Sequence, residues 1–311
     1  MKCFGLDIGY GDTKAFDGVN IISFPTAVSM VVDQDGFDPK TCIIIDNEKF
    51  YAGSDVKGES LWFDPRTADF VGSTRWAAVF AKALKDSCFN TFRNSIVLGM
   101  PAAQYSRTKA SNIIHQLKQK YISFGNEDRI DLINSNISIV PQGLGIYIKY
   151  VTDTKIDYKR LRIAVADIGY HTIDLVTMYQ GKYLNDHAKS YPLGISKLLD
   201  AIAKEFCCKY GFFINRKRAL DFATNRRVEW LGELYEVDNI DDIIKKYANE
   251  VADIINNYME SQDLDIGIAG GGGTYTLVNF LKLKKKLALV KSPESANAVG
   301  YWHYGMLSQE G

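Results

Sequence analysis

The sequence lacks the features that mark several large classes of protein. Its five cysteines include no Cys-x-x-Cys pair, and they are Cys3, Cys42, Cys88, Cys207 and Cys208. We therefore expect reduced thiols and no disulfide framework. The four histidines lie far apart along the chain, which argues against a zinc site. No apolar run approaches the roughly 18 residues of a membrane helix, and the first residues lack the pattern of a secretion signal. These absences predict a cytoplasmic protein without a membrane segment.

An excess of charge of one sign is also missing. Lys and Arg number 37, Asp and Glu number 37, and the formal net charge is +0. The chain therefore has no basic field that could hold nucleic acid directly, and any contact with DNA is expected to pass through a partner. A length of 311 residues and an apolar share of 46% suit two fully folded domains of about 150 residues each.

Apolar periodicity predicts strands and helices along the whole chain. Helical spacing covers residues 73–88, 106–121, 143–151, 194–210, 215–224, 238–259 and 292–307, with a further helix from Thr274. Short strands are expected at residues 2–8, 13–16, 43–46, 49–52, 95–98, 130–140, 161–166, 264–269 and 286–291. The polar segment 152–160 has no periodicity and marks a domain boundary. Strands followed by helices, twice over, indicate mixed-sheet α/β domains.

One motif joins the first two predicted strands. It reads Asp7-Ile8-Gly9-Tyr10-Gly11-Asp12-Thr13-Lys14, and its Gly-x-Gly turn predicts a tight β-hairpin. Polyphosphate binding needs backbone N–H groups that a ligand can approach closely, which favours glycine, and it benefits from a hydroxyl and a nearby cation. The candidate phosphate-binding residues are Gly9, Tyr10, Gly11, Asp12, Thr13 and Lys14. The alternative is an ordinary hairpin with a surface lysine.

The same pattern returns about 160 residues later, at the head of the second half. It reads Asp167-Ile168-Gly169-Tyr170-His171-Thr172-Ile173-Asp174. The repeated Asp-Ile-Gly-Tyr tetrapeptide indicates internal duplication of a domain that begins with a hairpin. The candidate phosphate-binding residues here are Gly169, Tyr170, His171 and Thr172, although His171 is equally compatible with a plain loop residue.

Two further features suit nucleotide chemistry. Asp7 and Asp167 end strands, where aspartate is disfavoured unless it has a task, and we predict that they hold Mg²⁺ through water. The alternative is two solvated strand-end carboxylates. The run Gly270, Gly271, Gly272 and Gly273 stands between a strand and a helix, as a nucleotide-cradling turn would, although a flexible turn or helix cap also explains it. The P-loop and dinucleotide fingerprints are missing from the sequence.

Together these motifs resemble those of the actin, sugar-kinase and heat-shock-chaperone superfamily. The first Asp-x-Gly segment resembles its phosphate-1 motif, the second resembles phosphate-2, and Gly270-Gly271-Gly272 resembles the adenosine motif. Val140-Pro141-Gln142-Gly143 is similar to the first connecting motif. Ala296-Asn297-Ala298-Val299-Gly300 is similar to the closing helix of bacterial and archaeal actin-like proteins of the ParM type.

The resemblance implies an α/β, two-domain actin-like ATPase fold, made of duplicated ribonuclease-H-like domains with ATP or ADP and Mg²⁺ in the cleft between them. Domain I would comprise residues 1–151, with residues 300–311 packing back on it and a small lobe at about 18–85. Domain II would comprise residues 152–299, with a small lobe at about 193–254.

By the same resemblance, Gln142 would orient the attacking water, since a glutamine is too weak a base to take the proton. Asp174 would relay that proton; the alternative is an inward-facing carboxylate satisfied by hydrogen bonds. Such a site works by positioning and charge neutralisation, which implies a slow Mg²⁺-dependent ATPase.

The resemblance favours a protein that polymerises with itself into nucleotide-dependent filaments and segregates plasmid DNA through a DNA-binding adaptor. One alternative is a small-molecule kinase of the same superfold, which would normally use an aspartate base in the cleft; Gln142 at the water-positioning place argues against it. Another is a cytoskeletal or shape-determining actin homologue with no role in segregation.

Overall fold

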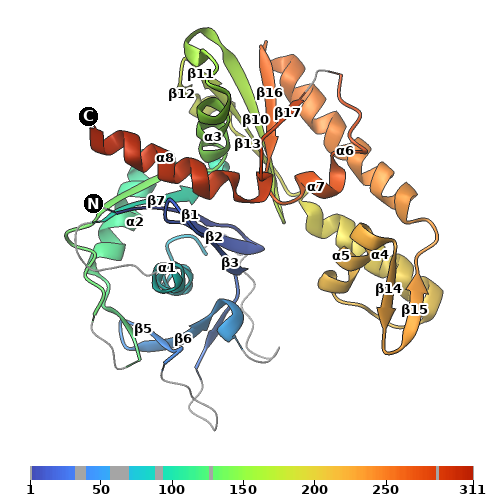
Figure 1. The fold of residues 1–311 in the computed structure, drawn as a ribbon, viewed down its shortest axis with the longest axis horizontal. Coiled ribbons are helices and arrows are strands. Elements are labelled where there is room, and N and C mark those ends of the chain that lie inside the picture. Colours follow the sequence, from blue (N-terminus) through green and yellow to red (C-terminus); the bar gives the residue numbers. More distant parts are fainter. Residues whose placement is uncertain are drawn as a thin grey trace. The chain divides into compact units, whose positions relative to one another are not determined.

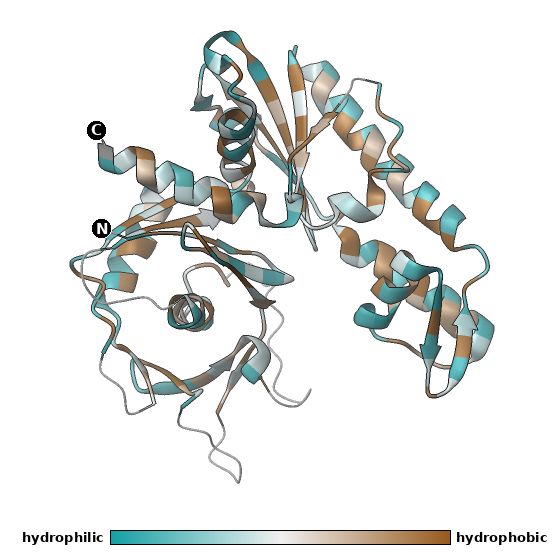
Figure 2. Ribbon diagram, viewed as in Figure 1, coloured by the Kyte–Doolittle hydropathy of each residue, from teal (hydrophilic) through white to brown (hydrophobic). Residues whose placement is uncertain are grey.

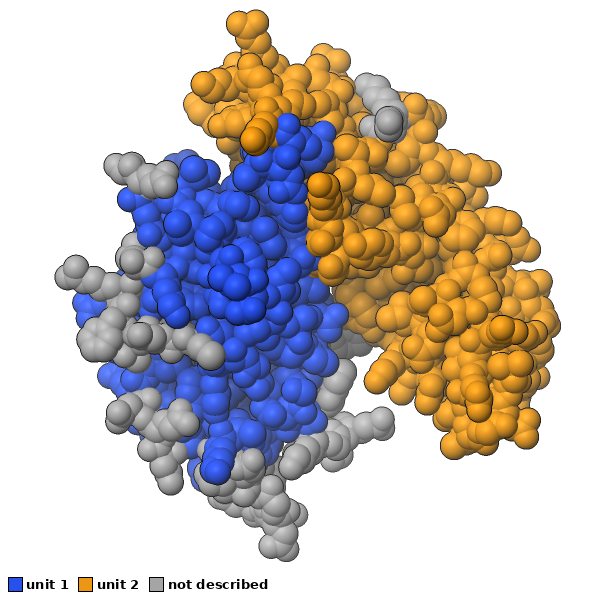
Figure 3. Space-filling view, viewed as in Figure 1, with its two compact units in different colours: residues 1–154, 295–311 blue, residues 155–294 orange. Residues whose placement is uncertain are grey.

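The computed structural model describes residues 2–31, 40–56, 70–87, 94–125, 129–284 and 287–310. These residues fall into two compact units (Figure 3). Unit 1 contains Met1–Thr154 and Ser295–Gly311, and unit 2 contains Lys155–Glu294. Cys88, predicted to be a reduced thiol, and Lys286, predicted to begin a strand, lie outside the described ranges. The other four cysteines are free.

The main sheet of unit 1 has the strand order β3-β2-β1-β7-β9. Its strands are β1 (Cys3–Ile8), β2 (Asp12–Phe16), β3 (Ile21–Pro25), β7 (Ser95–Met100) and β9 (Asn136–Pro141). The first three pair antiparallel, whereas β7 runs parallel to both β1 and β9. All residues of β1 and β7 are buried, which explains their continuous apolar sequence.

Helix α1 (Thr74–Asp86) packs between this sheet and a second one (Figure 1). The second sheet contains β4 (Val28–Met30), β6 (Glu48–Ala52), β5 (Ile43–Ile45) and β8 (Ile122–Phe124). Because both sides of the helix are covered, every residue from Trp76 to Leu84 is buried. Lys82 lies within that stretch, and its charge is compensated by Asp55 and Asp86, each 2.9 Å away.

The other face of the main sheet carries α8 (Ala296–Glu310), which also packs on α3 (Leu144–Thr154). Helix α2 (Arg107–Gln119) contacts β9. Glycines allow α8 to approach closely: a Cβ atom on Gly5 would strike the backbone of Ala298, and one on Gly300 would strike the backbone of Gly145. The last helix of the chain is therefore an integral part of unit 1.

The main sheet of unit 2 has the strand order β12-β11-β10-β16-β17, and β13 also pairs with β11. Its strands are β10 (Arg162–Ile168), β11 (Ile173–Tyr179), β12 (Lys182–Tyr183), β13 (Lys189–Tyr191), β16 (Ile266–Gly270) and β17 (Leu287–Leu289). Apolar residues recur along β10 and β16 (Figure 2). Helix α6 (Ile240–Ser261) buries one apolar stripe in the same core. The single-turn helix α7 (Thr274–Leu277) follows β16.

A smaller group of elements completes unit 2 (Figure 1). It contains α4 (Ile195–Tyr210), α5 (Arg216–Asn225) and the hairpin of β14 (Arg227–Trp230) and β15 (Glu233–Glu236). Phe206 forms ring contacts with Tyr210, Phe212, Phe222 and Tyr235, at centroid distances of 4.7 to 5.6 Å. These aromatic contacts hold the group around its own core.

The α/β class is confirmed, and two predicted elements need correction. The strand predicted at residues 130–140 begins only at Asn136, because Asp131 accepts a hydrogen bond from the Ile133 N–H and turns the chain first. The last helix begins at Ala296 rather than Ser292, which has a φ of +47° and is followed by a 3₁₀ turn. Among the helices of the described ranges, none combines the length and apolar character needed to cross a membrane.

We expect Gly300→Ala to lower the free energy of unfolding by about 2 to 3 kcal/mol, because the added methyl group would meet the Gly145 backbone and force α3 and α8 apart. Urea unfolding followed by circular dichroism measures the change. Ser308→Ala, on an exposed position of the same helix, is the control and should stay within about 0.5 kcal/mol of wild type. Equal stability of the two variants would contradict the close packing.

Candidate functional site

The first Asp-x-Gly motif forms a hairpin at the end of β1. Asp7 lies directly across from Lys14, and Ile8 lies across from Thr13. The N–H of Gly9 donates to the carbonyl of Asp12 at 3.2 Å and closes the loop. A Cβ atom on Gly9 would lie 2.8 Å from that carbonyl oxygen, so the tight turn needs glycine.

Asp7 is a buried carboxylate with amide partners from two other segments. Its side chain is 9% exposed, and Gln142 Nε2 donates to its Oδ1 at 3.1 Å. The side chain of Asn297 also hydrogen-bonds to it. Burial raises the pKa of Asp7, while the charge of Lys14 and the two amides lower it without cancelling the rise. Burial therefore outweighs the nearby charge and donors, and the fold favours the protonated form of Asp7 more than the unfolded chain does.

Gln142 is fixed at both its backbone and its side chain. It follows β9, and its N–H donates to the carbonyl of Met100 at 2.7 Å. Its amide nitrogen donates to Asp7, so its other side-chain atom, Oε1, is turned away from that carboxyl group. An amide oxygen can accept a hydrogen bond from a water molecule but cannot take its proton. Gln142 therefore offers a hydrogen-bond acceptor and no base.

Other predicted residues of the first loop have different surroundings. Thr13 is fully buried on the face of the sheet opposite Asp7, and its hydroxyl pairs with that of Thr26 at 2.8 Å. The structure thus does not bring the Thr13 hydroxyl together with Asp7 and Lys14. Tyr10 packs against the core, and its hydroxyl accepts a hydrogen bond from Gln104 at 3.2 Å.

The rest of the loop remains open. Asp12 is exposed, and the carbonyl of Gly11 accepts a hydrogen bond from the Thr26 N–H at 2.8 Å. Lys14 is half-buried on the Asp7 face and forms no ion pair within the described ranges. Its ammonium group is therefore the cation that this loop offers to an anion.

The second motif repeats the hairpin in unit 2. The N–H of Gly169 donates to the carbonyl of Thr172 at 2.9 Å, as the N–H of Gly9 does in unit 1. Here the residue across from Asp167 is Asp174, so two buried carboxylates stand opposite each other on neighbouring strands. Thr172 Oγ1 donates to Asp174 Oδ2 at 2.8 Å. Like charges in this arrangement are unfavourable unless a proton or a cation compensates.

Helix α4 supports this loop from behind. The N–H groups of Gly194, Ile195 and Ser196 donate to the carbonyls of His171, Gly169 and Tyr170 at 3.0, 3.1 and 2.8 Å. The Ser196 hydroxyl also pairs with His171 Nδ1 at 2.9 Å. The start of α4 is thus occupied by the loop itself, and His171 is held toward the helix.

The glycine run packs directly on the second loop. Gly271 has a φ of +89°, and a Cβ atom there would strike the Asp167 carboxylate. The N–H of Gly273 donates to the carbonyl of Ile168 at 2.9 Å. By contrast, a Cβ atom on Gly272 would meet nothing within 4 Å, so this backbone is open to a ligand. The structure therefore brings together the two elements of unit 2 that the sequence singled out.

The donor chemistry suits a hard divalent ion shared with phosphate oxygens. Within the described ranges, three or more His, Cys, Asp or Glu side chains do not gather into a metal cluster. Mg²⁺ commonly takes only one or two carboxylates and completes its shell with water and phosphate. Asp7, Asp167 and Asp174 are buried carboxylates of this kind.

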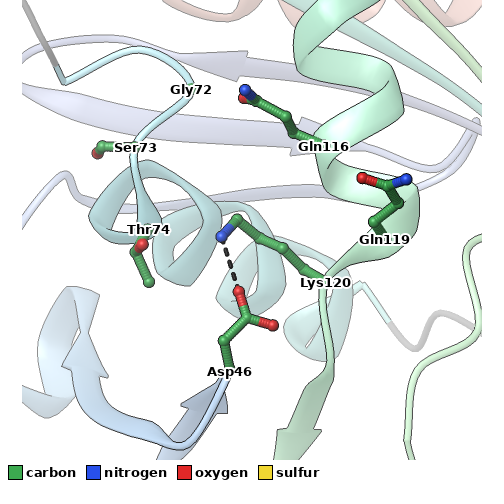
Figure 4. A pocket seen from close by; sticks show the side chains of 7 residues that line it. All are labelled: Asp46, Gly72, Ser73, Thr74, Gln116, Gln119 and Lys120. Atoms are coloured by element: carbon green, nitrogen blue, oxygen red, sulfur yellow. Dashed lines mark hydrogen bonds and ion pairs between the residues drawn. The ribbon is translucent and has the colours of Figure 1, made fainter.

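A groove elsewhere in unit 1 is of a different character (Figure 4). It lies at the start of α1 and is lined by Asp46, Gly72, Ser73, Thr74, Gln116, Gln119 and Lys120. Its one cation, Lys120, pairs with Asp46 at 2.9 Å. The hydroxyl of Ser73 already caps α1. The charged pair and the capping serine are therefore engaged within the fold, and we assign the groove no role.

Two residues of the site were not predicted as site residues, although Asn297 lies in the segment Ala296-Asn297-Ala298-Val299-Gly300 that resembles the family's closing helix. Asn297 sits in the first turn of α8, and Thr26 follows β3. The available signal for Asn297 was an amide among the small residues of an otherwise apolar helix start. Thr26 carried none, because its partner Thr13 becomes its neighbour only through strand pairing.

Comparison with known proteins agrees with this architecture. Residues 5–145 match the family model of the actin-like proteins N-terminal domain, and residues 165–283 match that of the archaeal actin homologue MreB-like C-terminal domain. Comparison with curated protein sequences finds no match.

Solved structures share the fold over the full length. An archaeal actin homologue has a TM-score of 0.80 at 19% identity, covering 99% of this chain and 100% of its own. A 15-stranded ParM filament from Clostridium botulinum gives 0.77 at 20% identity, covering 98% and 99%. ParM from Bacillus thuringiensis with ATP gives 0.72 at 16% identity, covering 100% of each chain. The predicted two-domain fold is confirmed.

The raised pKa of Asp7 predicts a pH-dependent difference between wild type and Asp7→Asn. A carboxyl group whose folded pKa lies above its unfolded value of 3.8 binds more protons in the folded state. Wild type should therefore lose stability relative to the variant as pH rises above about 4, up to the folded pKa. Urea unfolding between pH 3 and 8, without nucleotide or metal, measures the difference.

Asp17→Asn is the matched control with the opposite sign. Slight burial raises the pKa of Asp17, but the N–H groups of Asn20 and Val19 outweigh it and lower the pKa below 3.8. Wild type should gain stability relative to this variant as pH rises toward about 4. A pH-independent difference for Asp7→Asn would show that Asp7 keeps an ordinary pKa.

Proposed function

The chain belongs to the actin-like proteins, and from that premise we propose that it is a slow, Mg²⁺-dependent ATPase that polymerises into nucleotide-dependent filaments. The observation that carries the proposal is the repeated hairpin. Each unit has a buried aspartate, Asp7 or Asp167, one residue before the end of its first strand, and the hairpin that follows turns on a glycine.

In unit 1 the phosphate groups would be bound by the backbone of Gly9 to Asp12 and by the Lys14 ammonium group. Thr13 contributes its backbone only, since its hydroxyl is engaged with Thr26. In unit 2 the backbone of Gly169 to Thr172 binds phosphate, and the open backbone at Gly272 receives the nucleoside. Gly271 and Gly273 shape that turn against the second loop.

Asp7 and Asp167 would hold Mg²⁺, directly or through water. The ion supplies charge neutralisation at the phosphate oxygens when it is bound. Two residues of the chain would then act on the attacking water. Gln142 accepts a hydrogen bond from the attacking water and orients it, and Asp174 receives the proton that the water releases. A site that relies on positioning without a strong base is expected to be slow.

Self-association is the second part of the proposal. One solved structure with this fold is a ParM filament, and others are ParM proteins with ATP or with a nucleotide analogue. A formal net charge of +0 gives the chain no means of holding DNA by electrostatics alone. The likeness to ParM structures leads us to include plasmid segregation in the proposal, and the balanced charge leads us to place a DNA-binding adaptor between the filament and the plasmid.

Light scattering and pelleting at rising protein concentration test the proposal, with Mg-ATP, Mg-ADP or no nucleotide, alongside phosphate release. Assembly above a critical concentration with ATP, followed by phosphate release, supports the cytomotive function. A protein that stays monomeric and consumes ATP only when a small-molecule acceptor is added would be a kinase instead. Adding a plasmid centromere with candidate adaptors then separates segregation from a purely cytoskeletal role.

We expect Gln142→Ala to slow phosphate release by about 100-fold while ATP-triggered assembly persists, because the change removes the amide that would orient water, and with it one donor to Asp7, but leaves the backbone of both phosphate loops unchanged. Stopped-flow phosphate detection and pelleting measure the two effects. Gln116→Ala is the matched control on the exposed surface of α2 and should leave both unchanged. An undiminished rate in Gln142→Ala would remove this residue from the mechanism.

A further inference from the structure

Asn297 makes more contacts with the hydrolytic residues than a helix-start asparagine needs. It is the second residue of α8 and is 4% exposed. Its Oδ1 accepts hydrogen bonds from the N–H of Gly143 at 3.2 Å and of Ile146 at 3.3 Å. Its side chain also hydrogen-bonds to the Asp7 carboxylate. Since Oδ1 is the acceptor for two N–H groups, Nδ2 is the donor to Asp7.

The two bonds to the backbone replace a local helix cap. Helix α3 begins directly after Gly143, which has no side chain to satisfy the first N–H groups of the helix. Asn297 binds the N–H of Gly143, just before the helix, and that of Ile146 in its first turn, from 154 and 151 residues away in the sequence. The start of α3 is therefore fixed by α8 and not by its own preceding residue.

Gln142 lies between these anchors. Its own N–H is bound by the Met100 carbonyl, and the next N–H, that of Gly143, is bound by Asn297. Its side chain is bound by Asp7, which Asn297 also contacts. Asn297 thus contacts both neighbours of Gln142: the Gly143 N–H, which follows it in the backbone, and Asp7, which binds its side chain.

We propose that Asn297 is a positioning residue that fixes the Gln142 side chain for water activation, acting through the start of α3 and through Asp7. This inference rests on the proposed ATPase function. Without Asn297, the α3 N-terminus loses its cap and Asp7 loses a donor, so the Gln142 amide has room to take other orientations. A displacement of about 1 Å in such a group is enough to cost about 100-fold in rate.

A purely structural cap would give a different result, and the chain offers a matched control. Asn256 in α6 of unit 2 is 6% exposed, and its side chain also bridges backbone groups. Its Oδ1 accepts from the Lys284 N–H at 2.9 Å, and its Nδ2 donates to the Lys282 carbonyl at 3.3 Å. Asn256→Ala therefore removes a comparable buried amide from unit 2, where it has no contact with Gly143, Ile146 or Asp7 among its hydrogen bonds.

The kinetic test compares Asn297→Ala with Asn256→Ala in the full chain. Asn297→Ala should lower the single-turnover rate of phosphate release 10- to 100-fold while the Kd of a fluorescent ATP analogue changes less than about threefold. In a Gln142→Ala background the same substitution should cause no further loss. Asn256→Ala should lower thermal stability and leave the rate unchanged. If the rate losses of the two single variants multiply in the double variant, the proposal is overturned. An unchanged rate in Asn297→Ala would overturn it as well.

A second readout does not depend on hydrolysis. The side-chain amide signal of Gln142 in a ¹H–¹⁵N spectrum of the ligand-free protein, assigned by its loss in Gln142→Ala, should shift in Asn297→Ala and stay in place in Asn256→Ala. If wild type hydrolyses no ATP, the proposed function fails while this signal still tests Asn297. Should Asn297→Ala fold poorly, Asn297→Ser retains a capping hydroxyl that is too short to serve all three partners. It should show an intermediate shift, and an unshifted signal would overturn the proposal.

Discussion

A carboxylate buried at the end of a strand needs hydrogen-bond donors from its own fold, and Asp7 imposes this constraint on unit 1. Each donor or charge comes from a different part of the chain. The return strand β2 brings Lys14, the end of β9 brings Gln142, and the first turn of α8 brings Asn297. None of these segments can shift without leaving Asp7 underpaired. A single desolvated group thus ties together the first strand, the third parallel strand and the last helix.

The second unit repeats the hairpin of the first, but the residue opposite its aspartate is an acid and not a lysine. In both hairpins the cross-strand partner follows the aspartate by the same number of residues, and the same glycine N–H closes the turn. Lys14 attracts Asp7, whereas Asp174 repels Asp167. The repulsion costs stability in the empty fold and is relieved by a cation or a proton. The two units therefore share the hairpin geometry, whereas the residue across from the aspartate is a cation, Lys14, in one and a carboxylate, Asp174, in the other.

The elements that sequence could predict are those whose signal is local. The two Asp-x-Gly hairpins and the glycine run have turn chemistry written in adjacent residues, and α1 and α6 have long apolar patterns. Thr26 carries no such signal, and the motif that contains Asn297 predicts a helix but no contact for its side chain, because the partners of both residues lie on segments that only the folded chain brings near. The same reason explains Thr13. Its hydroxyl looked available in the motif, but strand alternation turns it to the core face, away from Lys14.

The packing of α3 against α8 has one more consequence for the site. The chain passes from unit 1 to unit 2 after Thr154, where α3 ends, and returns at Ser295, just before α8 begins. Both connections therefore leave from this helix pair, whose backbones meet at Gly145 and Gly300. Glycine contacts of this kind leave no compressible side chain between two helices, so they move together or separate as units. Asn297 in the first turn of α8 accepts hydrogen bonds from the N–H groups of Gly143 and Ile146 at the start of α3, so a separation of the two helices would break both bonds next to Gln142.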